Sequence, residues 1–221
     1  DADVIVIGNA MSRGNEEVEA VLQRRLRYLS LPETMKEYFL RGKRNYVITG
    51  THGKTTTTSM LAWLMEDSVL EGDEYDTAFF DKRSKFLHYL PELVVINNIE
   101  FDHADIYNSL EEIKLSFRRL TQIIPRNGLA LVNADDPNCL DVVKGAPCPV
   151  KTMGFSDSSN IRILDVETST DGSHFTLEGT RYYVPMIGEF NIRNAAMAIA
   201  AAQFAGLNVK QLADSMSRFE G

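Results

Sequence analysis

The strongest constraint on the fold is the stretch at residues 46–56, Tyr-Val-Ile-Thr-Gly-Thr-His-Gly-Lys-Thr-Thr. Three β-prone residues run into two glycines, and a helix-like segment begins near Lys54. Gly50 and Gly53 allow a sharp backbone turn that aims successive N–H groups at anionic oxygens. We therefore predict a strand, a loop and a helix in the arrangement that holds the phosphates of a nucleotide.

The loop and the start of the following helix are together predicted to bind phosphate. The start of the helix adds the positive end of the helix dipole. Lys54 supplies a point charge to the β- and γ-phosphates, and Thr55 supplies a hydroxyl to the accompanying Mg²⁺. The predicted nucleotide-binding residues of the loop are Gly50, Thr51, His52, Gly53, Lys54, Thr55 and Thr56.

The loop departs from the usual pattern at one position, because Ile48 stands where a glycine is expected. The alternative is an ordinary glycine turn between a strand and a helix, with Lys54 in solvent. A Gly-Lys-Thr-Thr sequence at a strand-to-helix switch favours the phosphate site.

Composition narrows the class of protein. With 221 residues, of which 44% are hydrophobic and 24% charged, the chain matches ordinary globular proteins of one or two domains. Its net charge of −8 argues against a general nucleic-acid-binding surface. No stretch approaches the roughly 20 apolar residues of a membrane span, and the first residues lead into a strand without a signal peptide. We expect a cytoplasmic protein without nucleic-acid or membrane partners.

The two cysteines, Cys139 and Cys148, flank a proline-containing loop. We expect two unrelated thiols in a reducing compartment. A disulfide between them is the alternative.

The central part of the chain alternates strands and helices. Continuous apolar runs at 46–49, 93–96 and 129–132 predict buried parallel strands. Helical patterns stand between them, and the one after residue 109 opens with a capping box, Ser-Leu-Glu-Glu. This alternation predicts an α/β fold with a mostly parallel, doubly wound sheet.

The period of the pattern changes near residue 161. Short strands at 161–167, 173–177 and 181–185, joined by Asp-Gly and Glu-Gly turns, predict a small antiparallel meander. An alanine-rich helix at 195–202 and a last helix at 209–219 follow.

The N-terminal part predicts an incomplete α/β unit. The apolar run at 4–7 is typical of a buried parallel strand, and a polar loop follows it. The next helix places four apolar residues on one face, namely Val18, Val21, Leu22 and Leu26. A second helix is predicted at 33–40, with Pro32 in its first turn, before a basic linker.

One strand and two helices do not complete a sheet domain. We therefore predict that residues 1–44 are the C-terminal part of a Rossmann-like domain that starts before residue 1. Residues 45–221 are predicted to form the P-loop domain.

Polar clusters follow several strands, at the edge where open α/β sheets bind ligands. The clusters are Glu71/Asp73/Glu74/Asp76, Glu100/Asp102/His103/Asp105 and Asp135/Asp136. Glu71, about one residue past its predicted strand, supplies the carboxylate that Mg²⁺ needs beside Thr55. His103 is predicted to hold a second metal ion or to contact the transferring phosphate. A helix cap or a solvated acid is the alternative for each cluster.

Three stretches resemble, in order, the ATP-site motifs of the Mur ligase family. They are Thr-Gly-Thr-His-Gly-Lys-Thr-Thr at 49–56, Glu-Phe-Asp-His at 100–103 and Gly-x-Phe-Asn-x-x-Asn-Ala-Ala at 188–196. The family consists of ATP-dependent ligases that form amide bonds in peptidoglycan synthesis. The resemblance covers essentially the whole chain.

The resemblance implies ATP and Mg²⁺ as cofactors and assigns roles to the loop and its surroundings. Lys54 holds the phosphates, while Thr55 and Glu71 bind the first Mg²⁺. His103 serves a second Mg²⁺, which in the family bridges the γ-phosphate and the substrate carboxylate. Lys54 and His103 are thereby the candidate catalytic residues.

The resemblance also implies contacts with the base and the substrates. Asn191 and Asn194 address the adenine with their amide groups. The loop at 9–15 looks like part of a UDP-sugar site. The candidate substrate-binding residues are Asn9, Ser12, Asn15, Asp73 and Glu74.

Within the family, the stretches at 8–15, 71–76 and 79–86 are most similar to one branch. That branch joins UDP-N-acetylmuramate to the recycled murein tripeptide L-Ala-γ-D-Glu-meso-diaminopimelate through an acyl phosphate. The alternative is the branch that adds L-alanine, which lacks the Asp-Lys-Arg-Ser-Lys stretch at 81–85. The three basic residues of this stretch are candidates for binding an anionic substrate, or form a solvated loop.

Two alternative hypotheses place the chain outside this enzyme class. One is a nucleotide-binding regulatory module that has a P-loop but no turnover. The other is a P-loop kinase, against which the isoleucine at position 48 counts. The acidic and imidazole clusters favour a catalytic site, because a binding switch needs fewer metal ligands.

The chain also departs from the family pattern. Family members start with a glycine-rich strand turn and end with a Rossmann-like domain that delivers the amine, and residues 1–221 contain neither. Only Asp67-Ser68 separates the P-loop helix from the next strand, so we expect that residues found in the family are missing there. Arg118 stands near the modified lysine of several members, so we expect no carbamylated lysine.

Overall fold

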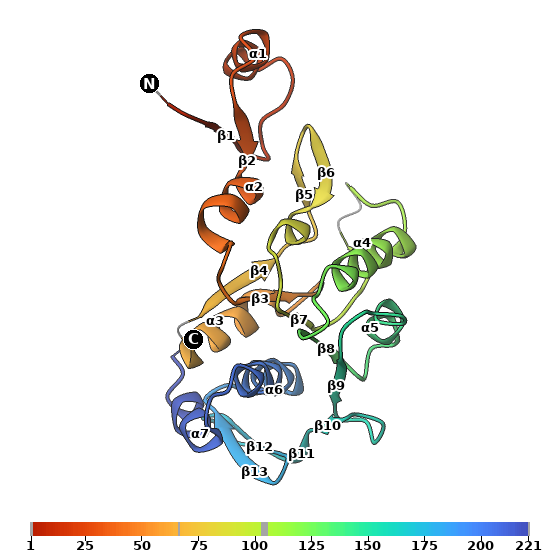
Figure 1. Cartoon of the computed structure of the whole chain (residues 1–221). Coiled ribbons are helices and arrows are strands. Elements are labelled where there is room, and N and C mark those ends of the chain that lie inside the picture. Colours follow the sequence, from red (N-terminus) through yellow and green to blue (C-terminus); the bar gives the residue numbers. More distant parts are fainter. Residues whose placement is uncertain (1, 66, 103–105, 221) are drawn as a thin grey trace.

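The structure of the chain, a computed structural model, describes residues 2–65, 67–102 and 106–220. Its centre is a six-stranded, all-parallel sheet in the order β10-β9-β8-β7-β3-β4 (Figure 1). The strands are β3 (Asn45–Thr49), β4 (Ser68–Gly72), β7 (Leu93–Ile96), β8 (Leu129–Asn133), β9 (Val150–Gly154) and β10 (Ile161–Arg162). The predicted α/β fold with a mostly parallel sheet is confirmed.

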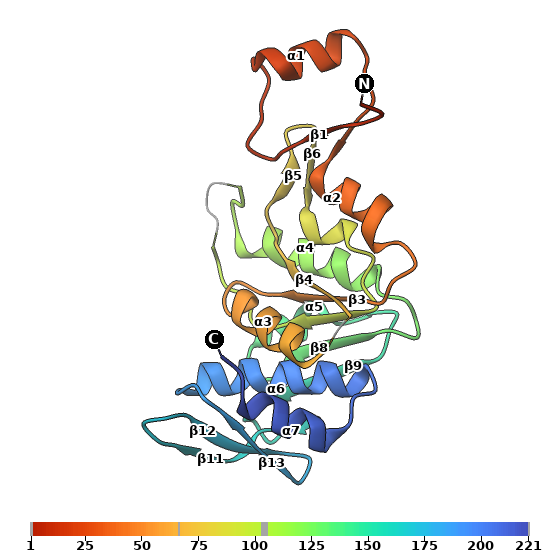
Figure 2. The ribbon, with the colours of Figure 1, turned by 90° about the vertical axis from the view of Figure 1, so that its left-hand side faces the viewer.

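Helices cover both faces of this sheet (Figure 2). They are α3 (Lys54–Leu64), α6 (Glu189–Phe204) and α7 (Val209–Ser217) on one face, and α4 (Leu110–Gln122) and α5 (Pro137–Val142) on the other. Side chains of β3 alternate between the two layers. Ile48 packs in the core with α3 and α6, whereas Val47 packs in the core with α4 and α5. All five residues of β3 are buried, as expected for a central strand covered on both faces.

The alanine-rich helix α6 packs against α3 and lies next to the sheet. It begins at Glu189, six residues before the predicted start. Its buried alanines are Ala195, Ala196, Ala198, Ala200, Ala201 and Ala202. Small side chains let two helices approach closely, and here they bring the start of α6 to the loop before α3.

The antiparallel meander lies beyond α6 and α7 (Figure 1). It consists of β11 (Leu164–Thr168), β12 (Ser173–Leu177) and β13 (Thr180–Val184), in the order of the chain. At the second turn Glu178 has φ +47° and Gly179 φ +79°, which matches the two-residue hairpin turn predicted there. The meander is confirmed, with its first strand starting later than predicted.

The N-terminal residues form a small unit above the central sheet (Figures 1 and 2). It contains β1 (Ile5–Ile7) and β2 (Tyr28–Ser30), which pair in parallel, and the helix α1 (Glu16–Gln23). The predicted second helix is α2 (Leu31–Met35), which continues as a π-helical turn at Lys36–Leu40. Ser30 caps α2 in a reciprocal capping box with Glu33, which the sequence analysis did not recognise.

A two-stranded hairpin reaches from the central domain toward this unit (Figure 1). Its strands are β5 (Asp76–Ala78) and β6 (Asp81–Ser84), followed by a 3₁₀ turn at Lys85–His88. The ring of Phe80 meets the ring of Tyr28 edge to face, with centroids 5.0 Å apart. The hairpin thereby connects the N-terminal unit to the central domain through an aromatic contact.

Several predictions for the N-terminal unit were wrong. The run at 4–7 is a strand, but Val6 is 45% exposed, because β1 has a single neighbouring strand and helices do not cover both its faces. Leu26 is 41% exposed and lies beyond the end of α1, after Arg25 with φ +51°. The strand β2 was not predicted, because three residues carry little periodic signal.

Other corrections concern the central sheet. Residues 161–162 were assigned to the meander but extend the parallel sheet as β10. The strand β9 and the helix α5 were not predicted. Both cysteines are free, and Cys139 lies on α5, where burial raises the pKa of its thiol. The expectation of two separate thiols is confirmed.

In the parts of the chain that the structure describes, the helices are too short or too polar to cross a membrane.

Candidate functional site

The predicted phosphate-binding loop connects β3 to α3 at the carboxyl edge of the sheet. Gly50 has φ +130° and Gly53 has φ +79°, a region that favours glycine. A Cβ on Gly50 would lie 2.9 Å from the backbone N and O of Asn98. A Cβ on Gly53 would lie 2.7 Å from Oδ1 of Asn194. Both glycines are thus required by backbone conformation and by close packing.

Lys54 turns its ammonium into this loop. Its Nζ donates to the Gly50 carbonyl at 2.8 Å and lies 3.1 Å from both carboxylate oxygens of Glu74. The side chain of Lys54 is 13% exposed and that of Glu74 is 2% exposed. The predicted phosphate-binding lysine is therefore paired with a buried carboxylate, and an incoming phosphate would compete with Glu74 for it.

The carboxylate beside Lys54 stands three residues after the predicted metal ligand, Glu71. Glu71 does not follow its strand as predicted, because it is the fourth residue of β4 and pairs with Ile48. Its exposed side chain lines a separate cavity. The structure thus brings Glu74 to the phosphate-binding loop, and the metal-binding role of Glu71 stays a prediction.

The start of α3 offers the donors that a phosphate needs. Gly53 at the N-cap provides no side-chain hydrogen bond, and the first turn has no acidic residue. The first N–H groups of a helix have no carbonyl partner within it, so those of Lys54, Thr55 and Thr56 remain for a ligand. The side chain of Thr55 is exposed, as binding to an ion requires.

Three asparagines for which no role was predicted hold the loop in place. The backbone carbonyl of Asn98 accepts the N–H of Thr51 at 3.0 Å, and its side-chain Oδ1 accepts the N–H of His52 at 2.8 Å. Asn97 donates from Nδ2 to Thr57 Oγ1 at 2.9 Å, and Asn133 donates from Nδ2 to the Asn97 carbonyl at 2.8 Å. Their signal in the sequence is that they stand at the carboxyl ends of adjacent strands, β7 and β8.

The two asparagines predicted to address adenine lie at the start of α6, next to the loop. Asn194 is 2% exposed, and its Nδ2 is buried without a hydrogen-bond partner among the described residues. Asn191, one turn earlier, is partly exposed and donates to the Ile187 carbonyl at 2.9 Å. The structure brings both residues to the predicted nucleotide site and leaves a buried donor there, while adenine recognition stays a prediction.

Two acids at this edge hold the loops after β8 and β9 in place. The Asp135 carboxylate accepts the backbone N–H groups of Phe155 at 2.9 Å and Ser156 at 3.0 Å. It also forms an ion pair with Arg193 at 3.2 Å. Asp136 caps α5 and accepts the N–H of Ile99 at 2.7 Å. The structural alternative, a helix cap, therefore applies to this cluster.

A cavity of about 340 Å³ lies between the N-terminal unit and β4. It brings together Asn9, Glu71 and Asp73, three residues predicted for substrate or metal binding. Asp73 pairs there with Lys85 at 2.7 Å. Burial raises the pKa of Tyr89 on the same wall to about 12, so its phenol stays protonated.

Two other residues predicted for the sugar site are not part of this cavity's lining. Ser12 is exposed in the loop before α1. Asn15 caps α1, because its Oδ1 accepts the N–H groups of Glu17 at 3.0 Å and Val18 at 3.1 Å. This cap is a structural use of Asn15 that needs no ligand.

The second predicted metal site falls on His103, which lies outside the described residues. Within the described ranges, no group of three or more His, Cys, Asp or Glu side chains is arranged to hold a metal ion. Glu100, from the same motif, is exposed, and its carboxylate lies 3.7 Å from His52 Nε2.

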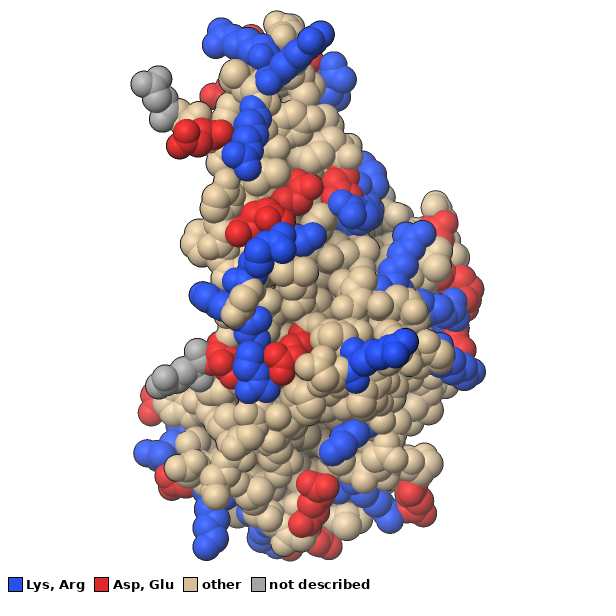
Figure 3. Space-filling model, viewed as in Figure 1, with Lys and Arg blue, Asp and Glu red and all other residues tan. Residues whose placement is uncertain are grey.

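Acidic and basic side chains are interspersed over the face shown in Figure 3. Many charged side chains of the described residues form ion pairs, such as Arg44 with Glu92 at 2.9 Å and Arg41 with Glu37 at 2.7 Å. This face therefore offers local charged sites in place of one continuous basic surface.

The chain is similar to known proteins in both sequence and structure. The sequence profile of the Mur ligase middle domain matches residues 69–202, more than half of the chain. A protein of Haemophilus influenzae, UDP-N-acetylmuramate–L-alanyl-γ-D-glutamyl-meso-2,6-diaminoheptandioate ligase, is 35% identical over 98% of this chain and 54% of its own length. The protein of that name from Escherichia coli is 34% identical with the same coverage. A UDP-N-acetylmuramate–L-alanine ligase of Psychrobacter cryohalolentis is 30% identical over 100% of this chain and 51% of its own length.

Solved structures give a similar result. A ligase from Neisseria meningitides that carries the name of the first two relatives superposes with a TM-score of 0.91 and 35% identity. That match covers 100% of this chain and 79% of the other. A murein peptide ligase from Psychrobacter arcticus gives a TM-score of 0.86 and 30% identity, covering 99% of this chain and 56% of the other. The chain spans about half the length of the curated relatives it matches.

Proposed function

The chain belongs to the Mur ligase family, and on this premise we propose that it is the ATP-binding part of a murein tripeptide ligase. The reaction joins UDP-N-acetylmuramate to L-alanyl-γ-D-glutamyl-meso-diaminopimelate at the expense of ATP. The observation that carries the proposal is that the two curated tripeptide ligases are 35% and 34% identical to the chain, whereas two L-alanine ligases are 30% and 31% identical, over nearly the whole chain in each case.

We propose that Lys54 binds the phosphates of ATP together with the N–H groups at the start of α3. The uncapped helix start, the two glycines with positive φ and the inward-facing ammonium all support this role. Phosphate oxygens would replace Glu74 as the partner of Lys54, because both are anions that accept hydrogen bonds from the same ammonium. The unpaired Nδ2 of Asn194 and the amide of Asn191 are the proposed contacts for adenine.

Residues of the chain also suit Mg²⁺, which when bound supplies positive charge to phosphate oxygens. The Thr55 hydroxyl is exposed at the helix start, and the Glu74 carboxylate is buried beside Lys54. We propose Thr55 and Glu74 as the protein ligands, because oxygen donors are those that Mg²⁺ prefers. Glu71 remains the alternative carboxylate, and His103 remains the prediction for a second ion.

The proposed reaction forms one amide bond and converts one ATP to ADP and phosphate. The muramate carboxylate attacks the γ-phosphorus, ADP leaves, and an acyl phosphate forms. The peptide amine then attacks the acyl carbon, so that a C–N bond forms, the C–O bond to phosphate breaks and the amine loses a proton. Lys54 and the loop N–H groups contribute by positioning and by charge, since the reacting groups are anionic.

The division of the chain is part of the proposal. Residues 1–44 would belong to a domain that binds the UDP-sugar, and residues 45–221 to the ATP-binding domain. The separate small sheet of the N-terminal unit and the cavity between it and β4 support this division. We place the ligase in the cytoplasm, where its nucleotide substrates are made.

The test is phosphate release by the full-length natural protein with ATP, Mg²⁺ and UDP-N-acetylmuramate. The tripeptide and free L-alanine are compared at equal concentration as the second substrate. We expect release with the tripeptide and little with L-alanine.

Two other outcomes would contradict the proposal in different ways. Release with L-alanine alone would assign the chain to the L-alanine branch. Release with neither, in a protein that binds ATP, would make it a nucleotide-binding module and overturn the reaction above.

A further inference from the structure

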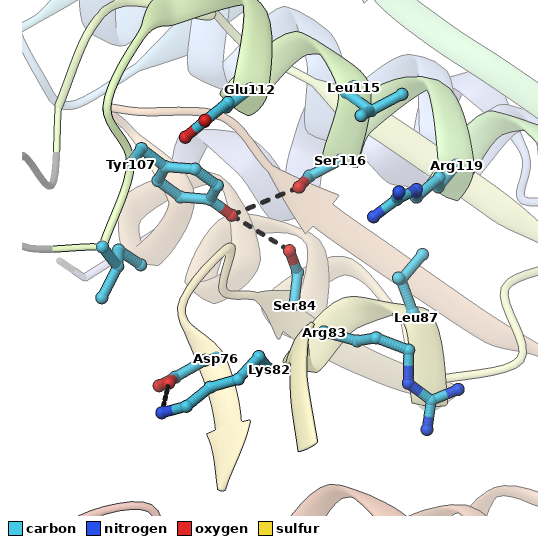
Figure 4. A pocket seen from close by; sticks show the side chains of 11 residues that line it. Asp76, Lys82, Arg83, Ser84, Leu87, Tyr107, Glu112, Leu115, Ser116 and Arg119 are labelled. Atoms are coloured by element: carbon cyan, nitrogen blue, oxygen red, sulfur yellow. Dashed lines mark hydrogen bonds and ion pairs between the residues drawn. The ribbon is translucent and has the colours of Figure 1, made fainter. Parts of the chain in front are cut away.

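A second cavity, of about 440 Å³, lies between the β5–β6 hairpin and α4 (Figure 4). Its volume is in the range of small-molecule sites. Side chains of the hairpin and of α4 face each other across it in Figure 4. Among the residues that the structure describes, none of those proposed above for ATP, Mg²⁺ or the UDP-sugar lines this space.

Among the described residues, three cationic side chains line the cavity, and two of them are already paired. Lys82 pairs with Asp76 at 2.6 Å, and Arg83 forms a two-pronged pair with Asp81 at 2.8 and 2.7 Å. Arg119, exposed on α4, has no ion-pair partner within the described ranges. Because the guanidinium fork matches a carboxylate, Arg119 is the cation that remains for an anionic group of a ligand.

An acidic residue stands on the same helix. Glu112 precedes Arg119 by seven residues, so the two lie on one face of α4, about 10 Å apart along its axis. Glu112 accepts the N–H of Asn108 at 2.8 Å, and its exposed carboxylate has further acceptor sites. One wall of the cavity thus carries a cation at one end and an anion at the other.

The floor of the cavity adjoins the phosphate site. Tyr107 Oη lies 3.1 Å from Ser84 Oγ and 3.4 Å from Ser116 Oγ (Figure 4). The same hydroxyl donates to the backbone carbonyl of Glu74 at 2.6 Å, and the carboxylate of Glu74 pairs with Lys54. Glu74 therefore links the two sites: its backbone carbonyl contacts Tyr107 of the cavity wall, and its carboxylate contacts Lys54 of the predicted phosphate-binding loop.

We propose that this cavity binds the peptide co-substrate, with Arg119 contacting a carboxylate and Glu112 facing an ammonium group. The inference rests on the proposed ligase function. The tripeptide carries several carboxylates and more than one amine, which suits a wall of mixed charge. The muramate has a carboxylate but no amine, and L-alanine is too short to reach from one charge to the other.

The first test is the KM of the full-length natural protein for the tripeptide. Arg119→Ala is expected to raise it roughly 10- to 100-fold, the usual loss for a charged hydrogen-bonded pair. The KM values for ATP and for UDP-N-acetylmuramate should stay within twofold of the wild-type values. The KM of Arg119→Lys for the tripeptide should lie between those of the wild type and Arg119→Ala. The matched control is Arg126→Ala, which removes another exposed arginine that does not line the cavity and should leave all three values unchanged.

A second test asks whether Arg119 and a carboxylate interact directly. A tripeptide whose diaminopimelate carboxylates are converted to carboxamides should bind the wild-type protein roughly 10-fold or more weakly. In Arg119→Ala the same modification should cost little further affinity, because the two changes remove one interaction. Equal losses in both proteins would overturn the assignment of Arg119 to these carboxylates.

The outcomes separate this inference from the function on which it rests. If the wild type uses the tripeptide and Arg119→Ala keeps its KM, the cavity is not the peptide site while the proposed function stands. If instead the KM for UDP-N-acetylmuramate rises, the carboxylate in the cavity is that of the muramate and the inference is overturned. If the wild type does not use the tripeptide, both proposals fail.

Discussion

The strands β3 and β1 are similar in sequence but differ in their surroundings. Both are short apolar runs that lead into a glycine-containing polar loop. β3 has neighbours on both edges, β4 and β7, and helices on both faces, so all of it is buried. Among the described strands, β1 pairs with β2 alone, and its central residue is 45% exposed. An apolar run thus predicts a strand, whereas the layers packed around it decide how much of it is buried.

The loops after these strands differ in the same way. The loop after β3 is held by Asn98, and a Cβ at Gly50 would meet backbone atoms. The loop after β1 contains Gly14, where a Cβ would meet nothing within 4 Å. Both loops were predicted to bind ligands, but within the described structure only the first is held tightly against its neighbours before a ligand arrives.

The largest expected effect tests the two strands. Ile48→Ala removes a fully buried side chain from β3 and should lower the free energy of unfolding by about 3 kcal/mol. Val6→Ala in β1 should cost less than about 1 kcal/mol, because much of that side chain is already in water. Urea unfolding measures both, and equal losses would mean that the N-terminal unit is packed more closely than described.

The next effect tests the two loops. Gly50→Ala should destabilise the protein by about 2 kcal/mol and weaken ATP binding, because φ +130° is strained and Asn98 is in the way. Gly14→Ala carries the strain of φ +93° without a clash, so about 1 kcal/mol is expected and no change in ATP affinity. Calorimetric titration with MgATP measures the affinities. An unchanged affinity in Gly50→Ala would contradict the close fit of the loop.

A third prediction compares two carboxylates in the segment that joins these regions. Glu74→Gln should lower the affinity for ATP in the presence of Mg²⁺ by about tenfold, since it removes a charged ligand of the ion. Glu71→Gln should change it by less than about twofold, because its side chain lines the other cavity. Titrating Mg²⁺ at fixed ATP distinguishes the two, and the reverse order of effects would restore Glu71 as the metal ligand.

The smallest effect concerns the hairpin between the two regions. A hydrogen bond from Arg83 lowers the pKa of Asp81 to about 2 from an ordinary value near 3.8. A carboxyl group with a lowered pKa stabilises the folded state above its unfolded pKa, and this contribution disappears as pH falls from about 4 to about 2. Because solvent screens the pair, Asp81→Asn should cost about 1 kcal/mol at pH 7.

The pH dependence of this difference is the measurement. The difference between the unfolding free energies of wild type and Asp81→Asn should shrink as the pH falls toward 2, where Asp81 is about half protonated in the folded state, and should vanish below that pH. A difference that persists unchanged at pH 2 would show that Asp81 acts by packing and not by its charge.

Much of the fold followed from local patterns. Buried parallel strands such as β7 are continuous apolar runs, and the turn before β13 has the Glu-Gly sequence of a tight hairpin. Elements with few residues or mixed composition were not predicted, as with β2, β9 and α5. The start of α5 did carry a local signal, because Asp136 caps it and Pro137 stands in its first turn, whereas the three residues of β2 carry little periodic signal.

The candidate site also has features that local sequence predicts and features that depend on strand pairing. The tight turn at Gly50 and Gly53 and the position of Lys54 beside it could be predicted, because such a turn constrains consecutive residues, and these are visible in the sequence. Phosphate binding by this turn stays a prediction. The position of Glu71 was misjudged by a short distance along the chain, since the end of a strand is set by its pairing with β3.

The sequence by itself determined where the chain turns after β3, which loop is predicted to bind phosphate, and which family the chain resembles. Only the tertiary structure decided that Glu74 meets Lys54, that Asn194 lies under Gly53, and that Arg119 faces the hairpin across a cavity. Each of these contacts joins residues that are far apart in the chain or on different elements. Such contacts depend on how layers pack, and no local pattern of residues encodes that.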